Sequence, residues 1–251
     1  MRTVFTTILF ALAALAQPPD LTIEAARAEA ARYAQSIPNY IVIRTTTRFR
    51  AKKYRNPDWH HTDTVSAEVA AHDNQEFYSG IRINGKLAKA LPSDGMWSNG
   101  EFSILLDQIF APQHAAIFTD RTADTRQSRP AWRYNFSIDA KHSGWDVIAD
   151  LLPYRVHSAP AYSGAVWIDR DTAKVLRIER SASSIPYPFP LRIIDSSTDY
   201  SPVRINDENY MLPTHSVTIT CTRDKSECLR NETVFENYRK FGASTSLTWE
   251  K

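Results

Sequence analysis

The densest group of side chains that could bind a ligand or a metal is Trp59-His60-His61 with Asp63. Imidazole and carboxylate groups bind zinc, but adjacent histidines on a strand point to opposite faces. Asn56 and Pro57 come just before them and predict a loop. The sequence therefore favours a surface loop over a metal site here, and the other histidines show no zinc-site spacing such as H-E-x-x-H.

Other patterns that could support catalysis are incomplete. Asp169 and Asp171 are spaced like acidic pairs that bind divalent cations, but they lie in a predicted hairpin turn, where aspartate bonds to nearby backbone. The serines that precede glycine lack the G-x-S-x-G pattern, and the seven glycines form neither G-x-G-x-x-G nor a P-loop. We therefore expect no catalytic residue, no metal, no cofactor and no enzymatic activity.

Aromatic and aliphatic side chains are the remaining candidates for a binding site. They could line an apolar cavity or fill a closed core, and the sequence leaves both arrangements open. The candidates for a cavity and its lid are Trp97, Phe102, Leu105, Leu106, Ile109, Phe110, Trp132, Tyr134, Phe136 and Trp167.

Two helices and about ten strands are predicted to position these side chains. Apolar residues at helical spacing predict a helix over 22–35 that is capped by Thr22, and a second over 102–110 behind a capping box at Ser98–Glu101. Residues 78–87 contain Asn84-Gly85, a favoured hairpin turn. Further alternating segments predict strands at 40–50, 65–71, 131–139, 145–149, 164–169, 175–182, 191–200, 210–222, 233–238 and 244–249. Short connections between them indicate one antiparallel α+β domain.

The N-terminus has the features of a secretory signal. Residues 1–16 combine Arg2, an apolar run and an A-x-A site, so we expect cleavage between Ala16 and Gln17 and a single domain over 17–251. The run from Val4 to Ala16 is shorter than the roughly 20 residues that span a bilayer, and we expect no membrane-spanning segment after cleavage. The protein is thus expected in the periplasm or outside the cell.

Composition and cysteine usage agree with export. The chain has 43% hydrophobic residues, and its 30 Lys and Arg nearly balance 28 Asp and Glu, so a nucleic-acid partner is not indicated. Cys221 and Cys228 close a polar loop between two strand-like segments, which favours a structural disulfide in an exported protein. A metal or redox pair is disfavoured because a second ligand pair and C-x-x-C spacing are missing.

Two segments resemble the outer-membrane lipoprotein carrier (LolA/LolB-like) superfamily. Gly164–Glu179, GAVWIDRDTAKVLRIE, is similar to a strand, Asp-x-x-Thr turn and return strand of that family, and Phe235–Trp249 looks like the end of an uncharacterised exported bacterial branch. The resemblance implies a strongly curved, incomplete β-barrel with helices on its concave side and a cavity for acyl chains. The helix over 102–110 would then be a lid.

The leading functional hypothesis is a non-enzymatic protein that binds a lipid, an acyl chain or a lipidated partner on the concave face. A second hypothesis is a periplasmic sensor or scaffold that binds an envelope protein through a sheet edge or the proline-rich segment 184–191. A third is an envelope hydrolase with a site assembled from scattered His and Asp, which the motifs do not support. The ligand, the oligomeric state and the pathway stay open.

Overall fold

A computed structural model of the chain describes residues 20–240, except 53, 73–74, 99, 152–153 and 225. The predicted signal segment 1–16, its cleavage site and the predicted strand 244–249 lie outside the described residues.

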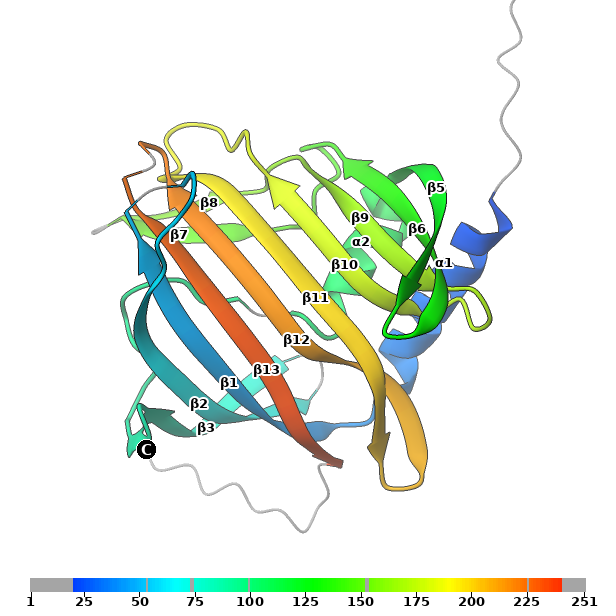
Figure 1. Ribbon diagram of the computed structural model, residues 1–251, viewed down its shortest axis with the longest axis horizontal. Coiled ribbons are helices and arrows are strands. Elements are labelled where there is room, and N and C mark those ends of the chain that lie inside the picture. Colours follow the sequence, from blue (N-terminus) through cyan, green and yellow to red (C-terminus); the bar gives the residue numbers. More distant parts are fainter. Residues whose placement is uncertain are drawn as a thin grey trace, which may run out of the picture.

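Eleven antiparallel strands form one large sheet in the order β4-β3-β2-β1-β13-β12-β11-β10-β9-β6-β5. The sheet is not closed, because β4 and β5 form its two edges (Figure 1). The strands are β1 (Tyr40–Ala51), β2 (His60–His72), β3 (Gln75–Ile83), β4 (Lys86–Leu87), β5 (Ile117–Arg126), β6 (Arg129–Ile138), β9 (Tyr162–Asp169), β10 (Val175–Ala182), β11 (Leu191–Ile205), β12 (Glu208–Thr222) and β13 (Cys228–Lys240). The predicted α+β incomplete barrel is confirmed.

A second, two-stranded sheet pairs β7 (Val147–Leu151) with β8 (Tyr154–Ser158). The strands β5 and β8 are absent from the elements that the sequence predicts. The Asn84-Gly85 turn between β3 and β4 is confirmed, and both of its residues have positive φ, as this hairpin turn requires.

The helices begin at other residues than predicted. Helix α1 (Leu21–Ser36) is capped by Asp20, whose Oδ1 accepts a hydrogen bond from the Thr22 backbone N–H at 2.9 Å, so Thr22 lies inside the first turn and is not the cap. Helix α2 (Ile104–Phe110) begins two residues later than expected and is followed by the short helix η1 (Pro112–His114). The predicted capping box is not at the start of α2, because the helix begins after Ser103; Ser98 Oγ instead donates to the Glu101 side chain at 2.5 Å.

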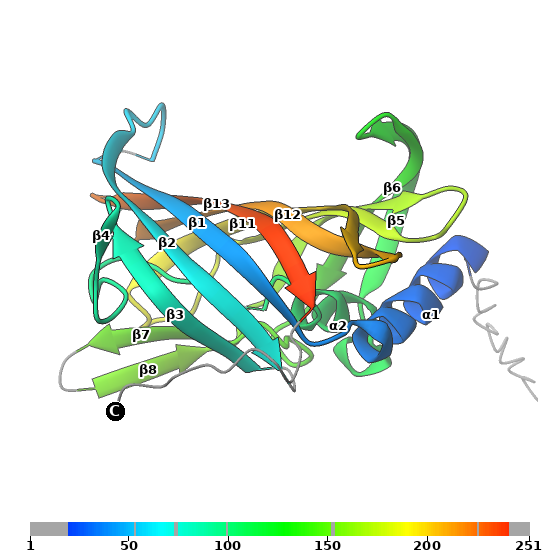
Figure 2. The ribbon, with the colours of Figure 1, turned by 90° about the horizontal axis from the view of Figure 1, so that it is seen from below.

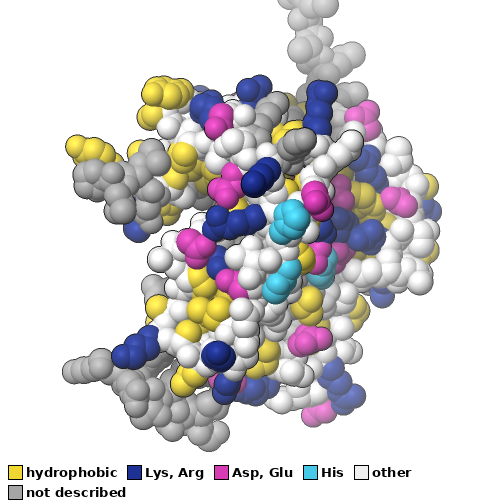
Figure 3. All heavy atoms as spheres, turned by 60° about the vertical axis from the view of Figure 1, so that its left-hand side comes forward, with side chains coloured by type: hydrophobic (Ala, Val, Ile, Leu, Met, Phe, Trp, Pro, Cys, Tyr) yellow, Lys and Arg dark blue, Asp and Glu magenta, His cyan; other side chains and the backbone are white. Residues whose placement is uncertain are grey.

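The sheet curves around its helices. Viewed from below, α1 and α2 lie beneath the right-hand side of the sheet, while β7 and β8 lie beneath its left-hand side (Figure 2). With the left-hand side of Figure 1 turned forward, the outline of the molecule is indented, and charged and hydrophobic side chains gather around the indentation (Figure 3). The concave side is therefore covered at both ends by separate elements.

The largest hydrophobic cluster joins both helices to the concave faces of β6, β9, β10 and β11. A second cluster joins β1, β2, β11, β12 and β13 around Tyr40 and Phe235. Phe102 belongs to this second cluster, whereas α2 belongs to the first. The segment that contains both therefore crosses from one cluster to the other.

Candidate functional site: a strap across the concave face

Residues 94–110, which we call the strap, cross the concave face and include α2. Six of the strap's backbone carbonyl oxygens accept hydrogen bonds, at 2.6 to 2.9 Å, from side chains of the sheet and of α1. The donor and acceptor pairs are Arg48–Asp94, Asn231–Met96, Arg44–Ser98, Tyr200–Glu101, Tyr162–Gln108 and Arg27–Phe110. Side chains far apart in the chain thus fasten a single segment.

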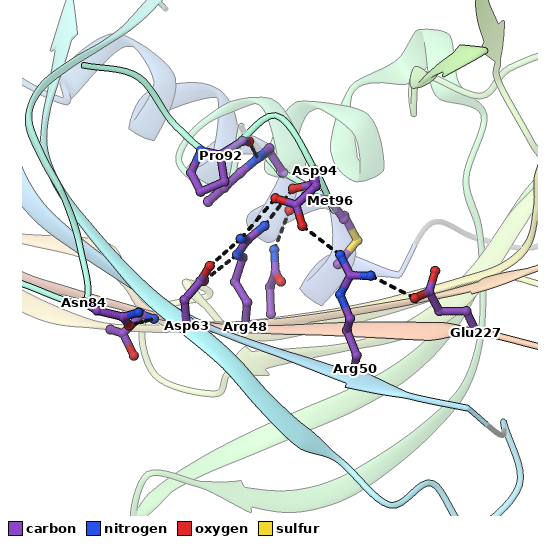
Figure 4. Close-up of polar contacts among 11 residues, drawn as sticks. Arg48, Arg50, Asp63, Asn84, Pro92, Asp94, Met96 and Glu227 are labelled. Carbon is purple, nitrogen blue, oxygen red and sulfur yellow. Dashed lines mark hydrogen bonds and ion pairs between the residues drawn. The ribbon is translucent and has the colours of Figure 1, made fainter. Parts of the chain in front are cut away.

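Two arginines of β1 hold the N-terminal end of the strap. Figure 4 shows Arg48 and Arg50 pointing from the sheet toward the loop that carries Asp94 and Met96. Arg48 donates to both carboxylate oxygens of Asp63 at 2.6 Å, and Arg50 Nη2 donates to Asp94 Oδ2 at 2.7 Å. The Arg48 charge is therefore compensated within the fold, and its hydrogen bond holds the pKa of Asp63 below its ordinary value.

Arg44 lies at the centre of a second, more deeply buried cluster. Its guanidinium donates to Tyr78 Oη and to the Ser98 carbonyl, both at 2.7 Å, and lies 3.9 Å from Glu76 and 3.8 Å from Glu101. Burial and the nearby Glu101 carboxylate raise the pKa of Glu76. Glu76 Oε1 also accepts a hydrogen bond from the Gly100 backbone N–H, so this cluster holds the strap through both kinds of backbone group.

A continuous polar row crosses the concave face beneath the strap. Neighbouring strands pair Arg180 with Ser196, Ser196 with Thr218, Thr218 with Asn231, Asn231 with Arg48, and Arg48 with Asp63. Paired residues point to the same face of a sheet, and the Arg48 and Asn231 bonds to the strap identify that face as the concave one. The middle of the concave face is thus polar, whereas the β6, β9 and β10 end is apolar.

The apolar helix α2 sits beside a cavity of about 140 Å³. Leu105, Leu106, Ile109 and Phe110 of α2 are all buried in the large cluster. The cavity lies between α1 and strands β10 to β12. Its lining combines Ala30, Tyr33, Leu106, Val175, Tyr200 and Met211 with polar residues that include Glu29, Arg32 and Lys174. The hydroxyl oxygen of Tyr33 is enclosed and has no hydrogen-bond partner.

The predicted cavity and lid residues do not form one group. Tyr134 and Phe136 join the four α2 residues in the large cluster, and Trp132 packs against its edge. Trp97 packs instead near Val65 and Ile81, with its ring 5.2 Å from the Arg48 guanidinium. Trp167 lies on the opposite face of β9 from Val166 and Ile168, where its Nε1 donates to Asp124 at 2.7 Å.

The other residues that the sequence singled out have structural partners. His60 and His61 are exposed at the start of β2, so they lie on a strand and not in the predicted loop, because they pair with Arg50 and Phe49 of β1. The predicted turn role of Asp169 is observed: its Oδ1 accepts hydrogen bonds from Asp171 N and from Thr172 N and Oγ1. Cys221 and Cys228 form the predicted disulfide between β12 and β13.

The side chains that fasten the strap were missed by sequence reasoning. A signal for three of them exists in β1, where Arg44, Arg48 and Arg50 fall on the same face as the buried Tyr40 and Val42. Arginine on the core face of a strand needs an internal acceptor, and this could have indicated a segment crossing that face.

Neither a metal centre nor a membrane helix is present in the part of the chain that the structure describes. No three His, Cys, Asp or Glu side chains among these residues are grouped so that they could hold a metal ion. None of the described helices is long and apolar enough to cross a membrane.

Comparisons with known proteins find similarity only among solved structures, because no family model and no curated protein matches the chain. A putative outer-membrane lipoprotein-sorting protein domain from Vibrio parahaemolyticus aligns over 89% of this chain and 93% of its own, with 9% identity and a TM-score of 0.43. A DUF1329 family protein from Desulfovibrio piger aligns over 90% and 95%, with 8% identity and a TM-score of 0.39. The Pseudomonas aeruginosa MucA/MucB complex gives 11% identity over 88% of this chain and 100% of that chain, with a TM-score of 0.24. A solved structure described as a lipoprotein-sorting domain is thus among the matches.

Proposed function

We propose that this chain is an exported, non-enzymatic binding protein that holds an acyl chain, as a free lipid or on a lipidated partner, on the concave face of its sheet. The observation that carries the proposal is the strap, which lays an apolar helix against that face and is held by separate polar bonds. Each such bond contributes only about 1 kcal/mol net, or about 2 from a charged donor. The strap can therefore open locally while the sheet stays folded.

The cavity beside α2 is the place where an acyl chain would first bind. Its volume of about 140 Å³ is enough for a short apolar segment, since a cavity of about 150 Å³ accommodates benzene. Burial of an acyl chain contributes roughly 0.8 kcal/mol per CH₂, and the ligand would replace contacts that Leu106 and its neighbours make in the closed form. Binding would shift the population toward the form in which α2 is displaced.

The place of action is proposed to be the periplasm or the exterior. The features of residues 1–16 support export, and the Cys221–Cys228 disulfide is of a kind that persists in oxidising compartments.

The test is to purify the mature chain 17–251 from a bacterial periplasm without detergent, and to record native mass spectra before and after organic extraction. We expect an adduct of lipid mass that extraction removes, and renewed uptake of added oleate. A clean apo mass together with no uptake of oleate or phospholipid would overturn the proposal.

A second candidate function, the binding of an envelope protein, is favoured by the segment 184–191. Tyr187 is 83% exposed at its tip, while Arg223 donates hydrogen bonds to the carbonyls of Ile185 and Phe189 at 2.9 Å. An exposed aromatic residue on a held loop is typical of binding hot spots. A photo-crosslinking amino acid at position 187 should capture one discrete protein in cells, and Arg223→Ala should weaken capture; adducts no different from those at exposed Tyr154 would contradict it.

A further inference from the structure

Arg180 is a partly buried cation that its own fold does not neutralise. Its Nη1 donates to Gln108 Oε1 at 2.6 Å, its Nε donates to Ser196 Oγ at 3.1 Å, and its guanidinium lies 3.7 Å from the centre of the Trp145 ring. All three partners are uncharged. Arg44 and Arg48, on the same face, each have carboxylates within 4 Å, whereas Arg180 has no such partner among the described residues.

The free edge of this guanidinium is open to a ligand. Nη2 of Arg180 has no hydrogen-bond acceptor in the described part of the chain, and it is not among the unpartnered atoms that protein fully encloses. Space of at least the size of a water molecule therefore adjoins it. Desolvation lowers the pKa of Arg180 to about 10, so the group stays positively charged at neutral pH.

The nearest acidic influence on Arg180 does not satisfy it. Glu101 acts on Arg180 only through its field, beyond ion-pair distance. The Glu101 carboxylate accepts a bond from Ser98 and lies 3.8 Å from Arg44. Tyr162 and Tyr200, the other groups that act on Arg180, carry neutral phenols at physiological pH, because burial raises the pKa of both.

A partly buried charge without a counter-ion is unfavourable, because it loses solvation and gains no carboxylate in return. An uncharged side chain such as methionine could pack on Trp145 without this cost. An arginine presents a planar fork that fits the two oxygens of a carboxylate or a phosphate. Ser196 on the neighbouring strand adds a hydroxyl group beside it, and Thr218 lies one strand further along the polar row.

We propose that Arg180 binds the anionic headgroup of an amphiphile, a carboxylate or a phosphate, whose chain enters the cavity beside α2. Tyr200 connects the two parts, since it is one of the residues that line that cavity and its phenol lies in the field of Arg180. Gln108, which Arg180 now contacts, lies two residues from Leu106 of the cavity. A ligand that takes over the guanidinium would thus also loosen α2. This inference rests on the proposed function and narrows its ligand class.

The first experiment needs no variant. The mature chain 17–251 is titrated with the fluorescent fatty acid cis-parinaric acid and with its methyl ester, which has the same chain but no charge. We expect the acid to bind at least about tenfold more tightly, as roughly 1.4 kcal/mol of headgroup interaction would give. Equal binding of acid and ester overturns the role of Arg180 but leaves the proposed function standing. Binding of neither overturns the proposed function.

Variants then locate the effect. Arg180→Met should remove the preference for the acid while leaving ester binding within about twofold, and Arg180→Lys should retain part of the preference. The control is Arg133→Met, which removes an arginine that lies over the ring of Trp167 on the opposite face. If Arg180→Met does not fold, as judged by circular dichroism, Arg180→Lys and the acid and ester comparison still decide. A preference that survives in Arg180→Met, or is lost in Arg133→Met, would contradict the proposal.

Displacement distinguishes the source of the anion. Oleate or lysophosphatidic acid should displace bound cis-parinaric acid, whereas inorganic phosphate at the same concentration should not. Displacement by inorganic phosphate would show that the site binds a free anion and would overturn the proposal that the ligand is an amphiphile.

Discussion

Three arginines on the concave face show how partners decide the role of a residue. Arg48 has two carboxylates within 4 Å, and Arg44 is buried between two glutamates and a tyrosine. Both are satisfied by the fold and serve to hold the strap. Arg180 holds α2 through the neutral amide of Gln108 and keeps one nitrogen without an acceptor. Of these three arginines, Arg180 is therefore the one that could form a new charged hydrogen bond with a ligand.

The Asp169 turn should be a strong determinant of stability. Its side chain is 1% exposed, accepts three local hydrogen bonds and also binds Arg129 at 2.6 Å. Asp169→Ala should lower the free energy of unfolding by about 2 to 4 kcal/mol, because three local donors and the Arg129 guanidinium lose their common acceptor. Asp171→Ala, at an exposed position of the same turn, should change it by less than about 0.5 kcal/mol. Urea denaturation at pH 7 measures both.

The difference in unfolding free energy between wild type and Asp169→Ala should depend on pH with a defined sign. Burial opposes ionisation of Asp169, but hydrogen bonds from Arg129 and Thr172 prevail and lower its pKa below 3.8. A depressed carboxyl pKa contributes stability that is present above the unfolded value and is lost as the pH falls through the folded value. The gap between wild type and Asp169→Ala should therefore narrow below about pH 3.8. A gap that widens there would contradict the assignment.

Glu76 should show the opposite dependence. Its pKa is raised above 4.5 by burial and by Glu101, so the folded state binds its proton more tightly than the unfolded state does. This contribution is present below about pH 4.5 and is lost as the pH rises through the folded value. Relative to Glu76→Gln, wild type should thus lose stability on going from pH 4.5 to neutrality, measured by thermal unfolding. The exposed Glu236→Gln is the control and should show no such trend.

At the scale of elements, alternation predicts strands that have one buried face. The prediction for 175–182 matches β10 at both ends, and that for 40–50 is one residue shorter than β1. The edge strand β5 was missed because nearly all of its residues are exposed, so its sequence lacks an apolar period. Exposed charged residues at a sheet edge are expected, since they discourage edge-to-edge pairing.

The candidate site was only partly predictable. The apolar residues of α2 indicated a helix that must be covered, and the structure buries them. The polar row could not be found, because Ser196, Thr218 and Asn231 come from three strands, and only the register of pairing aligns them. A single serine or threonine in an alternating segment is otherwise typical of a solvent-facing position.

The bonds that fasten the strap can be tested with isosteric variants. Tyr162→Phe and Tyr200→Phe each remove one hydroxyl that donates to a strap carbonyl and leave the ring in place. The double variant should open the strap more often, and amide protons of α2 should exchange about tenfold faster or more, as a loss of 1 to 3 kcal/mol implies. Tyr134→Phe, whose hydroxyl donates to Asp20 outside the strap, should leave that exchange unchanged. Equal acceleration in all variants would show that the strap is no separate unit.

The disulfide between β12 and β13 should matter for stability but not for the site. Cys221 and Cys228 are directly paired residues of the two strands, seven positions apart. Replacing both by serine should lower the free energy of unfolding by about 2.5 kcal/mol, following the loop-closure estimate. Oleate affinity should stay within about twofold when the variant is measured below its unfolding temperature. A large loss of oleate affinity in the folded variant would instead show that the region around the disulfide contributes to ligand binding.

At the scale of the whole molecule, an open sheet is combined with covers that are not part of it. The strap joins the two hydrophobic clusters, with Phe102 in one and α2 in the other, and the polar row lies between its attachment points. Displacement of the strap would therefore expose polar and apolar surface together. This is the surface that an amphiphile requires, and its binding would be coupled to stability because only the folded chain offers it.

Filling the cavity should separate stability from binding. Ala30 of α1 lines the cavity, and Ala30→Leu adds three carbon atoms to it. We expect the unliganded protein to be stabilised by at most about 2 kcal/mol, through added apolar burial. Ala31→Leu adds the same atoms at the next, exposed position of the helix and is the matched control.

In wild type and Ala31→Leu, oleate should raise the melting temperature as its concentration increases. In Ala30→Leu this rise should be smaller, because the leucine occupies the space that the acyl chain needs. If Ala30→Leu is stabilised and still responds to oleate as wild type does, the acyl chain binds elsewhere and the cavity is only a packing defect. If Ala30→Leu is destabilised, Leu106→Trp fills the same space from α2 and decides between these outcomes.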